Sequence, residues 1–402
     1  MLLVVLVGAG AGWVANKIRT RRQAIAAVRA AGGSVQFDYQ KQVAYTNTQG
    51  RPVYRQEPSA PVWLRRWLGD ELFQNIFRVS FIKSSKPASS EMPAIIAKFD
   101  RLEELDLGKY VGDGDAFRHL RGLSHLDRLW VAGPGVTDAA LAEIARVGTI
   151  QALWISKASA TDGGFAQLAV LENLKFLQVS DCANLSDLGA SRMIEGMPKL
   201  ERLNFNDRSK SVAATLSMIA RRHPDLKRIT LNQTDLTDDD LKAVEGMTRL
   251  RELYLRGTRI TDAGLAHLGS LKDLNAVDVR NTGVTDEGVK LLGRFTSLIG
   301  LYLGGTRVTD AGLVHIEKLA KLKHLQVPNS AVTDAGMTSI AKLTSLERLD
   351  LDELPGLTDA GLARLANLKS LKELSVVGTK VTPEGIATLR KAIPTLGKVT
   401  TR

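Results

Sequence analysis

The chain has 402 residues, of which 44% are hydrophobic and 24% are charged, a composition typical of a globular chain with a buried core. Its single cysteine, Cys182, excludes an intrachain disulfide and a zinc site built on cysteines, and we expect it to be a small buried residue. The formal net charge is +11, but residues 1–100 carry +8 of it, so the excess does not form the basic stripe that a nucleic-acid partner requires.

The N-terminal segment is a candidate membrane anchor. An unbroken run of apolar and small residues extends from Leu2 to Ala15. A helix over these residues reaches roughly 21 Å at about 1.5 Å per residue, short of a bilayer core of about 30 Å. We expect residues 2–15 to anchor the chain, within an apolar and cationic helix of residues 1–31, with Trp13 at the interface. The positive-inside rule then places the rest of the chain in the cytoplasm, because four cations follow the run: Lys17, Arg19, Arg21 and Arg22.

Two other interpretations of this segment stay open. A cleaved signal peptide, which would make the protein secreted or part of the cell envelope, normally begins with a positive region that this run lacks. The glycines between Val4 and Gly12 are typical of a nucleotide-binding loop, but that fingerprint needs a glycine where Trp13 stands, and no βαβ unit follows.

We expect residues 32–94 to form a small capping module that contains a loop. Apolar and polar residues alternate from Val35 to Tyr39, as in a strand. The segment from Asn47 to Pro61 is rich in turn residues, and apolar residues return at helical spacing between Trp63 and Leu72. A further capping strand is indicated from Phe77 to Phe81. We expect this module to cover the open end of the region that follows.

From residue 95 to residue 402 the chain repeats itself. The motif Thr-Asp-x-Gly-Leu, or a close variant, recurs ten times, and from Thr237 onward the copies are 24 or 25 residues apart. A strand motif, Leu-x-x-Leu-x-Leu, follows each copy, as in Leu250 to Leu255. One such unit cannot bury its own apolar face, so the repeats must stack. The motif copies begin at Thr137, Thr161, Ser186, Thr237, Thr261, Thr285, Thr309, Thr333, Thr358 and Thr382.

One repeat illustrates the physical basis of the pattern. In the strand, Leu253 and Leu255 point inward while the residue between them points outward. Thr261 is expected to cap a short helix, and Asp262 to place negative charge at the positive end of that helix. Gly264 allows the helix to approach its neighbour closely.

A column of hydroxyl residues follows the strands. We expect these residues to bond backbone groups between neighbouring repeats, because buried polar groups need partners. The column consists of Thr234, Thr258, Thr282, Thr306, Ser330 and Thr379.

The ten motif copies resemble the leucine-rich-repeat superfamily, in particular its ribonuclease-inhibitor-like and F-box-associated repeats with the same helix start. The N-terminal run makes the chain resemble a membrane-anchored member of bacterial type. The resemblance implies an α/β solenoid of about 12 repeats, with a curved parallel sheet on the concave face and short helices on the convex face. The chain departs from the family pattern where Cys or Asn usually forms a ladder between repeats, since Thr and Ser stand there instead. The repeats at Asp207 to Arg222 and at Asp352 to Leu357 are irregular.

The outward residues of the strands are the candidate binding surface. Trp130 and Trp154 lie in the same outward column on adjacent strands, with Phe176 diagonally beside them, and exposed aromatic clusters are typical binding anchors. The alternative is that the capping module covers them. The middle of the face is cationic and would suit an acidic peptide, although Glu252 and Asp278 neutralise part of it and a solvated face competes as an interpretation. The predicted partner-binding residues are Trp130, Trp154, Phe176, Arg202, Arg228, Tyr254, Arg256, Arg280 and Tyr302.

No catalytic or metal-binding pattern is found. The six histidines lack metal spacing, no GxSxG or phosphate-binding loop occurs, and helix capping accounts for the column of aspartates at the helix starts better than a row of calcium ions does. We therefore predict a non-catalytic, membrane-tethered scaffold that binds a protein or peptide, without a cofactor, metal, small-molecule substrate or nucleic acid.

Two alternatives to this function remain. Leu68 to Phe77 resembles the start of an F-box, which would make the chain a substrate-recruiting adaptor of a ubiquitin ligase. An F-box needs about forty residues of helix, whereas the strand-like segment from Val79 to Ile82 follows at once. A hydrolase within residues 34–90 is the second alternative, but such a segment is too short for most enzymes.

Overall fold

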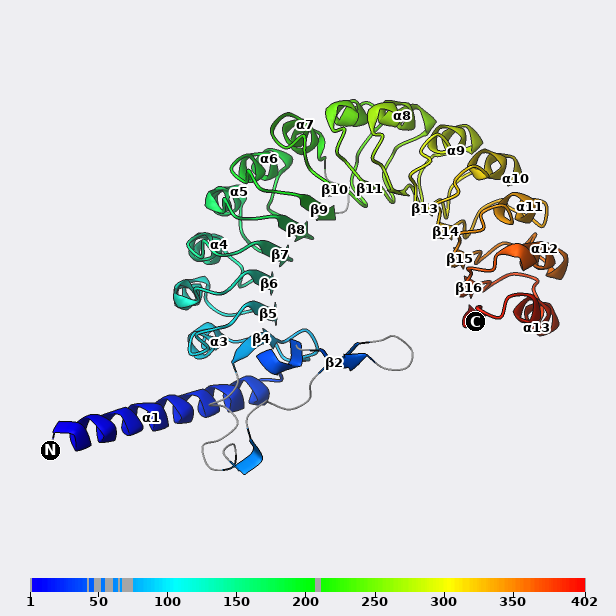
Figure 1. Ribbon diagram of the computed structural model, residues 1–402. Coiled ribbons are helices and arrows are strands. Elements are labelled where there is room, and N and C mark those ends of the chain that lie inside the picture. The colour runs from blue at the N-terminus through cyan, green and yellow to red at the C-terminus, as the bar shows by residue number, and fades with distance from the viewer. Residues whose placement is uncertain are drawn as a thin grey trace. The chain divides into compact units, whose positions relative to one another are not determined.

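The computed structural model contains two compact units, Met1–Lys199 and Leu200–Arg402, and each is described here by itself (Figure 1). In both units a strand, a turn and a short helix recur, and the helices lie on one side of the strands. The structure describes residues 2–41, 43–46, 52–54, 61–63, 66, 75–206 and 211–401.

The first unit contains a parallel sheet in which β4 to β8 pair in chain order, and β1 pairs antiparallel with β4. A separate antiparallel pair is formed by β2 and β3. Its strands are β1 (Ser34–Phe37), β2 (Val43–Thr46), β3 (Pro52–Tyr54), β4 (Ile76–Ser80), β5 (Glu104–Lys109), β6 (Arg128–Ala132), β7 (Ala152–Ser156) and β8 (Phe176–Ser180). Its α-helices and 3-10 helices (η) are α1 (Leu2–Ala30), η1 (Asp38–Lys41), α3 (Met92–Ile96), η3 (Gly114–Gly122), α4 (Asp138–Ala145), α5 (Asp162–Ala166), η4 (Gln167–Val170) and α6 (Asp187–Glu195).

The second unit repeats the same plan, with β9 to β17 paired in parallel in chain order. Its strands are β9 (Arg202–Asn206), β10 (Arg228–Thr230), β11 (Glu252–Tyr254), β12 (Ala276–Asp278), β13 (Gly300–Tyr302), β14 (His324–Gln326), β15 (Arg348–Asp350), β16 (Glu373–Ser375) and β17 (Lys398–Thr400). Its helices are α7 (Ala213–Arg222), η5 (Asp240–Gly246), α8 (Asp262–Ala266), η6 (His267–Ser270), α9 (Asp286–Leu292), α10 (Asp310–Leu313), η7 (Val314–Ile316), α11 (Met337–Ile340), α12 (Asp359–Arg364), η8 (Leu365–Asn367) and α13 (Pro383–Ala392).

The core of each unit is the apolar interior between strands and helices. Leu253 and Leu255 are completely buried, as are Leu268 and Leu274 of the same and the next repeat, so the predicted inward register is confirmed. Cys182 is also completely buried, which confirms its assignment as a small core residue. The alternate strand residues lie on the opposite side of the sheet, which we call the open face.

The Thr-Asp-x-Gly motif joins each repeat to the next. The carboxylate of Asp262 accepts hydrogen bonds from the backbone N–H and the hydroxyl of Thr285, one repeat later. The Thr285 hydroxyl also caps α9, because it accepts a hydrogen bond from the backbone N–H of Glu287. A Cβ on Gly288 would lie 2.3 Å from the Asp262 Oδ1. The glycine is thus required for this close approach. Each unit contains further pairs of the same kind: Asp138–Thr161, Asp162–Ser186, Asp238–Thr261, Asp286–Thr309, Asp310–Thr333, Asp334–Thr358 and Asp359–Thr382.

The irregular repeat before Thr237 interrupts this series. Helix α7 starts after Val212, whose side chain makes no capping hydrogen bond. Thr237 therefore has no aspartate of the preceding repeat to bond, and its N–H and hydroxyl donate instead to Asp240 of its own repeat, at 2.8 Å each. The start of the irregular repeat, residues 207–210, lies outside the described residues.

The hydroxyl column does not have the role that the sequence predicted. The Thr258 hydroxyl donates to the Leu255 carbonyl, three residues earlier in the same repeat, at 2.7 Å. The other members make the same bond within their own repeats. Between the two residues the backbone turns through a left-handed position, Gly257 with φ 68°, which brings the hydroxyl back over the end of the strand. The hydroxyls therefore close turns, and the aspartates and threonines of the helix starts form the ladder between repeats.

The N-terminal helix α1 covers both the apolar run and the cations that follow it. Its C-terminal part packs on the first unit, where Ala24, Ile25 and Val28 are buried and Lys17 forms an ion pair with Asp100 at 2.9 Å. In the part of the chain that the structure describes, no helix is both long enough and apolar enough to cross a membrane. The predicted apolar anchor helix is therefore not supported.

The capping module is described only in part. Strand β4 confirms the predicted strand at Phe77 to Phe81, within one residue, and its parallel pairing with β5 makes it part of the repeat sheet. Most of the predicted loop at Asn47 to Pro61, and residues 67–74 with most of the F-box-like segment, lie outside the described residues. The domain boundaries expected at residues 32 and 95 stay a prediction.

Candidate binding surface on the open face

On the open face of the first unit, four side chains form one continuous stack. The rings of Trp130 and Trp154, on β6 and β7, are stacked with centroids 4.0 Å apart and planes 14° apart. The ring of Phe176 lies 4.6 Å from Trp154, and the guanidinium of Arg78 lies 5.8 Å from the ring centroid of Trp130. We call Arg78, Trp130, Trp154 and Phe176 the aromatic stack.

The sheet register explains why these side chains meet. Trp130 pairs directly with Trp154, about 4.8 Å away, a spacing that suits ring stacking. Trp154 pairs with Gln178, so Phe176 reaches it diagonally from the next strand. The contact between the two tryptophans and the diagonal position of Phe176 are as the sequence indicates. Arg78, the fourth member of the stack, belongs to the predicted capping module, and no sequence pattern indicated its contact with Trp130.

The stack exposes ring edges rather than ring faces. Both faces of Trp154 are covered, and each tryptophan is half-buried. Phe176 is 7% exposed, so it supports the stack and offers almost no surface of its own. The cation of Arg78 is balanced by Glu104, which also pairs with Arg128. The open face of the first unit therefore presents two tryptophan edges beside a cluster in which one carboxylate, Glu104, pairs with two guanidinium groups.

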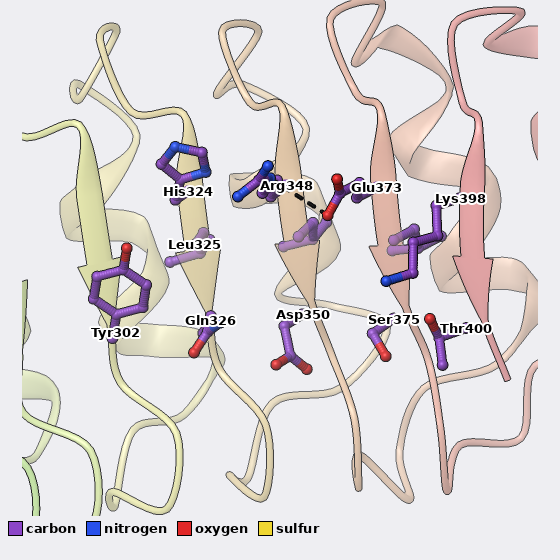
Figure 2. A pocket seen from close by; sticks show the side chains of 12 residues that line it. Tyr302, His324, Leu325, Gln326, Arg348, Asp350, Glu373, Ser375, Lys398 and Thr400 are labelled. Carbon is purple, nitrogen blue, oxygen red and sulfur yellow. Dashed lines mark ion pairs between the residues drawn. The ribbon is translucent and has the colours of Figure 1, made fainter. Parts of the chain in front are cut away.

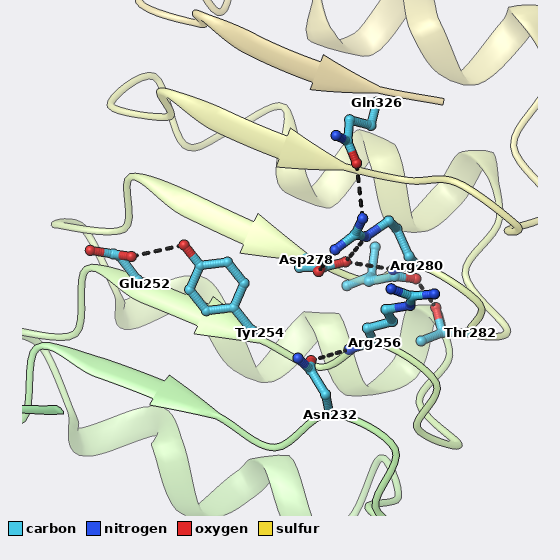
Figure 3. A network of polar contacts seen from close by, with 9 residues as sticks. Asn232, Glu252, Tyr254, Arg256, Asp278, Arg280, Thr282 and Gln326 are labelled. Carbon is cyan, nitrogen blue, oxygen red and sulfur yellow. Dashed lines mark hydrogen bonds and ion pairs between the residues drawn. The ribbon is translucent and has the colours of Figure 1, made fainter. Parts of the chain in front are cut away.

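In the second unit, two of the four predicted arginines, Arg228 and Arg280, are paired with carboxylates of the chain, and Figure 3 shows the contacts of Arg280. Arg280 makes a bidentate contact with Asp278, at 2.9 Å and 2.6 Å, and donates to the Gln326 Oε1 at 3.0 Å. Its guanidinium lies 5.4 Å from the ring centroid of Tyr302. The hydrogen bond to Asp278 raises the pKa of Arg280, against the effect of burial.

A second pair of the same kind lies on β10 and β11. Arg228 contacts the Glu252 carboxylate at 2.5 Å and lies 5.8 Å from the ring of Tyr254, whose hydroxyl donates to the same carboxylate at 2.8 Å. Burial raises the pKa of the Tyr254 phenol, and the bond to Glu252 adds to that effect. These two arginines are thus held by in-chain carboxylates, which reduces the positive charge that they offer to an acidic peptide.

The two remaining predicted cations are exposed. Arg202 pairs with Arg228 in the sheet register, on the neighbouring strand β9. Arg256 follows β11, and its backbone N–H donates to Asn232 of the preceding repeat at 2.9 Å. The predicted residues are therefore divided between the units: the aromatic group lies in the first, and all four arginines and both tyrosines lie in the second.

Sequence reasoning missed a hollow at the end of the second unit (Figure 2). It has a volume of about 380 Å³ and is formed on the open face by β13 to β17. One row of side chains contains Tyr302, Gln326, Asp350, Ser375 and Thr400, and the other contains His324, Arg348, Glu373 and Lys398. These outward residues can be read from the sequence, but a hollow depends on side-chain lengths and directions that periodicity does not supply.

The charges of the hollow differ in how they are paired. Arg348 forms an ion pair with Glu373 at 3.3 Å. Burial, followed by the neighbouring cation of Arg348, lowers the pKa of His324, which favours the neutral imidazole. Burial raises the pKa of Asp350, because no strong ion pair compensates its desolvation. Across the described residues, no group of His, Cys, Asp and Glu side chains is placed to hold a metal ion.

The chain is similar to several solved structures. The Rad7 and Elc1 complex from yeast contains a chain with a TM-score of 0.57 and 15% identity, covering 74% of this chain and 81% of that one. An internalin from Listeria monocytogenes has a TM-score of 0.49 and 19% identity, over 70% of this chain and 82% of its own. A leucine-rich-repeat protein from Leptospira interrogans has a TM-score of 0.42 and 16% identity, over 76% and 91%.

No family model matches the chain, and no curated protein matches its sequence. At these identities the likeness to the yeast structure concerns the fold alone. Together with the repeat period and the strand, turn and helix of each repeat, it identifies the architecture as stacked leucine-rich repeats.

Proposed function

We propose that the chain is a non-catalytic interaction module that binds a protein or peptide partner on its open sheet face. The observation that carries this proposal is the stack of Trp130 and Trp154, which places the edges of two large aromatic rings on the open face of the first unit. Tryptophan is among the side chains that contribute most to interface energies, because it offers a large contact area for few rotatable bonds.

The remaining features of the face favour a protein over other partners. A nucleic acid would need unpaired cations in a row, whereas Arg228 and Arg280 are paired with carboxylates. A stacking ligand such as a nucleobase would need a free ring face, and both faces of Trp154 are covered. A partner that packs against ring edges and hydrogen-bonds to indole N–H groups meets neither obstacle.

The test is affinity capture with the full chain as bait, followed by mass spectrometry. Three baits are compared: the wild type, Trp130→Ala, and Trp63→Ala as a control that removes an equally large but 69% exposed ring from another place. We expect one or more proteins to bind the wild type and the control, and to be recovered at least tenfold less with Trp130→Ala. Equal recovery on all three baits would place the binding surface elsewhere.

A second candidate is an F-box-like adaptor that recruits substrates to a ubiquitin ligase. The likeness to the chain crystallised in the yeast Rad7 and Elc1 complex favours it. Strand β4 begins at Ile76, so the F-box-like segment does not continue as a helix beyond that point. Under this alternative, Leu68→Ala should abolish capture of ligase subunits while Trp130→Ala leaves their capture unchanged.

We also propose that residues 1–22 tether the protein to a membrane, with the repeats on the cytoplasmic side. The support is the sequence alone: an apolar run followed by four cations. Expression of the full chain and of a chain that begins at residue 23, followed by fractionation, tests it. Recovery of the full chain in the soluble fraction after a high-speed spin would refute the tether.

A further inference from the structure

The carboxylate of Asp350 lacks a strong partner on the open face of the second unit. Within the described part of the chain, the hydrogen bond recorded for this carboxylate comes from the backbone N–H of Asp352, at 3.1 Å. The side chain is half-buried and lines the hollow, beside Ser375 on the next strand. A half-buried carboxylate without a cation in contact with it is costly, so a cation that binds there would stabilise it.

The chain itself contains the paired version of this arrangement. Asp278 occupies the same outward position on β12, three strands earlier, and it is held by the bidentate guanidinium of Arg280, two residues further along the chain. At Asp350 the residue two positions further is Asp352, an anion in place of that cation. Asp352 is used elsewhere, since its carboxylate accepts the backbone N–H of Val377 at 2.7 Å.

The surroundings of Asp350 offer polar groups to a cation, since Gln326 and Ser375 pair with it on the two neighbouring strands. The ring of Tyr302 lines the hollow two strands away and already contacts the guanidinium of Arg280, so the acceptors nearest to Asp350 are those of its own row. Ser375 and Thr400 place hydroxyl oxygens in the same row as the carboxylate (Figure 2). A guanidinium carries five N–H donors, and a carboxylate with two hydroxyls supplies acceptors for them.

The cations of the second row do not neutralise Asp350. Arg348 is paired with Glu373. Lys398 lines the hollow on the last strand, and no ion pair joins it to a described residue. Burial is the main cause that raises the pKa of Asp350, and the lowering effects of the Asp352 N–H and of Arg280 do not cancel it. The carboxylate is therefore free to accept a cation from outside the chain.

We propose that the hollow receives one basic side chain of the bound partner, an arginine or a lysine, whose cation pairs with Asp350 as Arg280 pairs with Asp278. This inference rests on the proposed function, because it identifies a specific anchor of the same kind of partner. The hollow of about 380 Å³ opens onto the sheet face, and it has room for one long side chain while the backbone of the partner stays outside.

The test uses the full chain and small probes, so it does not require the partner. Binding of N-acetyl-arginine amide and of its uncharged analogue, N-acetyl-citrulline amide, is followed by ligand-observed NMR titration. We expect the arginine probe to bind the wild type and the citrulline probe to bind at least tenfold more weakly. N-acetyl-lysine amide distinguishes the two basic side chains, and N-acetyl-aspartate amide tests whether Lys398 is the anchoring group instead.

Two variants locate the site. Asp350→Asn keeps the size of the side chain and its acceptor for the Asp352 N–H, and it should weaken the arginine probe at least tenfold. Glu353→Gln removes an equal charge from an exposed side chain three residues away and should leave binding unchanged. The proposal is wrong if the arginine probe does not bind, if citrulline binds equally well, if the aspartate probe binds instead, or if Asp350→Asn has no effect.

The outcomes for the hollow and for the proposed function are separable. In one outcome, Asp350→Asn loses probe binding while Trp130→Ala captures proteins as the wild type does. This outcome would support a basic-side-chain site in the hollow and refute the aromatic stack as the partner site. Capture that depends on Trp130, with no probe binding at Asp350, would support the function and refute the hollow.

Discussion

Asp262 of one repeat accepts two hydrogen bonds from Thr285 of the next, from the backbone N–H at 2.8 Å and from the hydroxyl at 2.6 Å. One acidic side chain thus satisfies two donors at the start of the following helix, where backbone N–H groups have no partner within the helix. The bonds recur from repeat to repeat within each unit. They explain why the motif contains an aspartate, which capping of its own helix alone does not require.

The first prediction concerns this ladder. Asp262→Ala leaves the Thr285 N–H and hydroxyl without their acceptor, so we expect it to lower the free energy of unfolding by about 1–3 kcal/mol. Asp273→Ala removes an exposed carboxylate from the same repeat and should cost under about 0.5 kcal/mol. Thermal melts followed by circular dichroism compare the two. Equal melting temperatures would show that the ladder does not hold the repeats together.

The second prediction concerns the glycine of the motif. A Cβ at Gly288 would lie 2.3 Å from the Asp262 Oδ1 and close to Val284 and Leu265, so Gly288→Ala must displace the ladder and should lower the melting temperature. At Gly269, nothing lies within 4 Å of an added Cβ. Gly269→Ala should therefore leave stability unchanged or raise it by about 0.4–1 kcal/mol. A stabilising Gly288→Ala would contradict the close approach of the helices.

The third prediction concerns the aromatic stack. Trp154 contacts a ring on each side, whereas Trp130 contacts one ring and one cation. Trp154→Ala should therefore destabilise the chain more than Trp130→Ala, by about 0.5–1.5 kcal/mol for the additional ring contact. Melting temperatures of the two variants test this order. The reverse order would mean that Arg78 and not Phe176 is the main support of the stack.

The repeat fold could be predicted from the sequence, because the period, the inward leucines and the helix starts are local patterns that recur. The stacking of Trp130 on Trp154 followed from the same register. What could not be predicted depends on directions of side chains: the hydroxyl of Thr258 folds back on its own repeat, and Asp262 reaches forward to the next. Periodicity gives the position of a residue, and both directions are compatible with it.

The candidate sites show the same limit. The sequence indicated a cationic middle of the face, but pairing decides whether such charge is available, and Arg280 is held by Asp278 through a bond between residues two apart. The hollow around Asp350 is formed by the side chains of five strands together, and no single repeat contains it. The sequence does contain a difference between the two positions, since Asp278 is followed two residues later by Arg280 and Asp350 by Asp352. This difference indicates an unpaired carboxylate only once Asp278 and Arg280 are known to form an ion pair.

The last prediction concerns the pH dependence of stability at Asp350. Burial raises the pKa of this carboxyl in the folded chain, Asp352 adds to the shift, and the Asp352 N–H and Arg280 oppose it. The folded state therefore binds a proton more readily than the unfolded state, so the ionised carboxylate costs stability at neutral pH and that cost disappears as the pH falls toward the unfolded pKa.

Asp350→Asn, which has no charge to desolvate, should melt at a higher temperature than the wild type at pH 7. The difference should shrink as the pH is lowered through the raised pKa, while Glu353→Gln should show no such trend. A lower melting temperature of Asp350→Asn at pH 7 would mean that the carboxylate is stabilised by an in-chain partner, and the reason to expect an external cation would be lost.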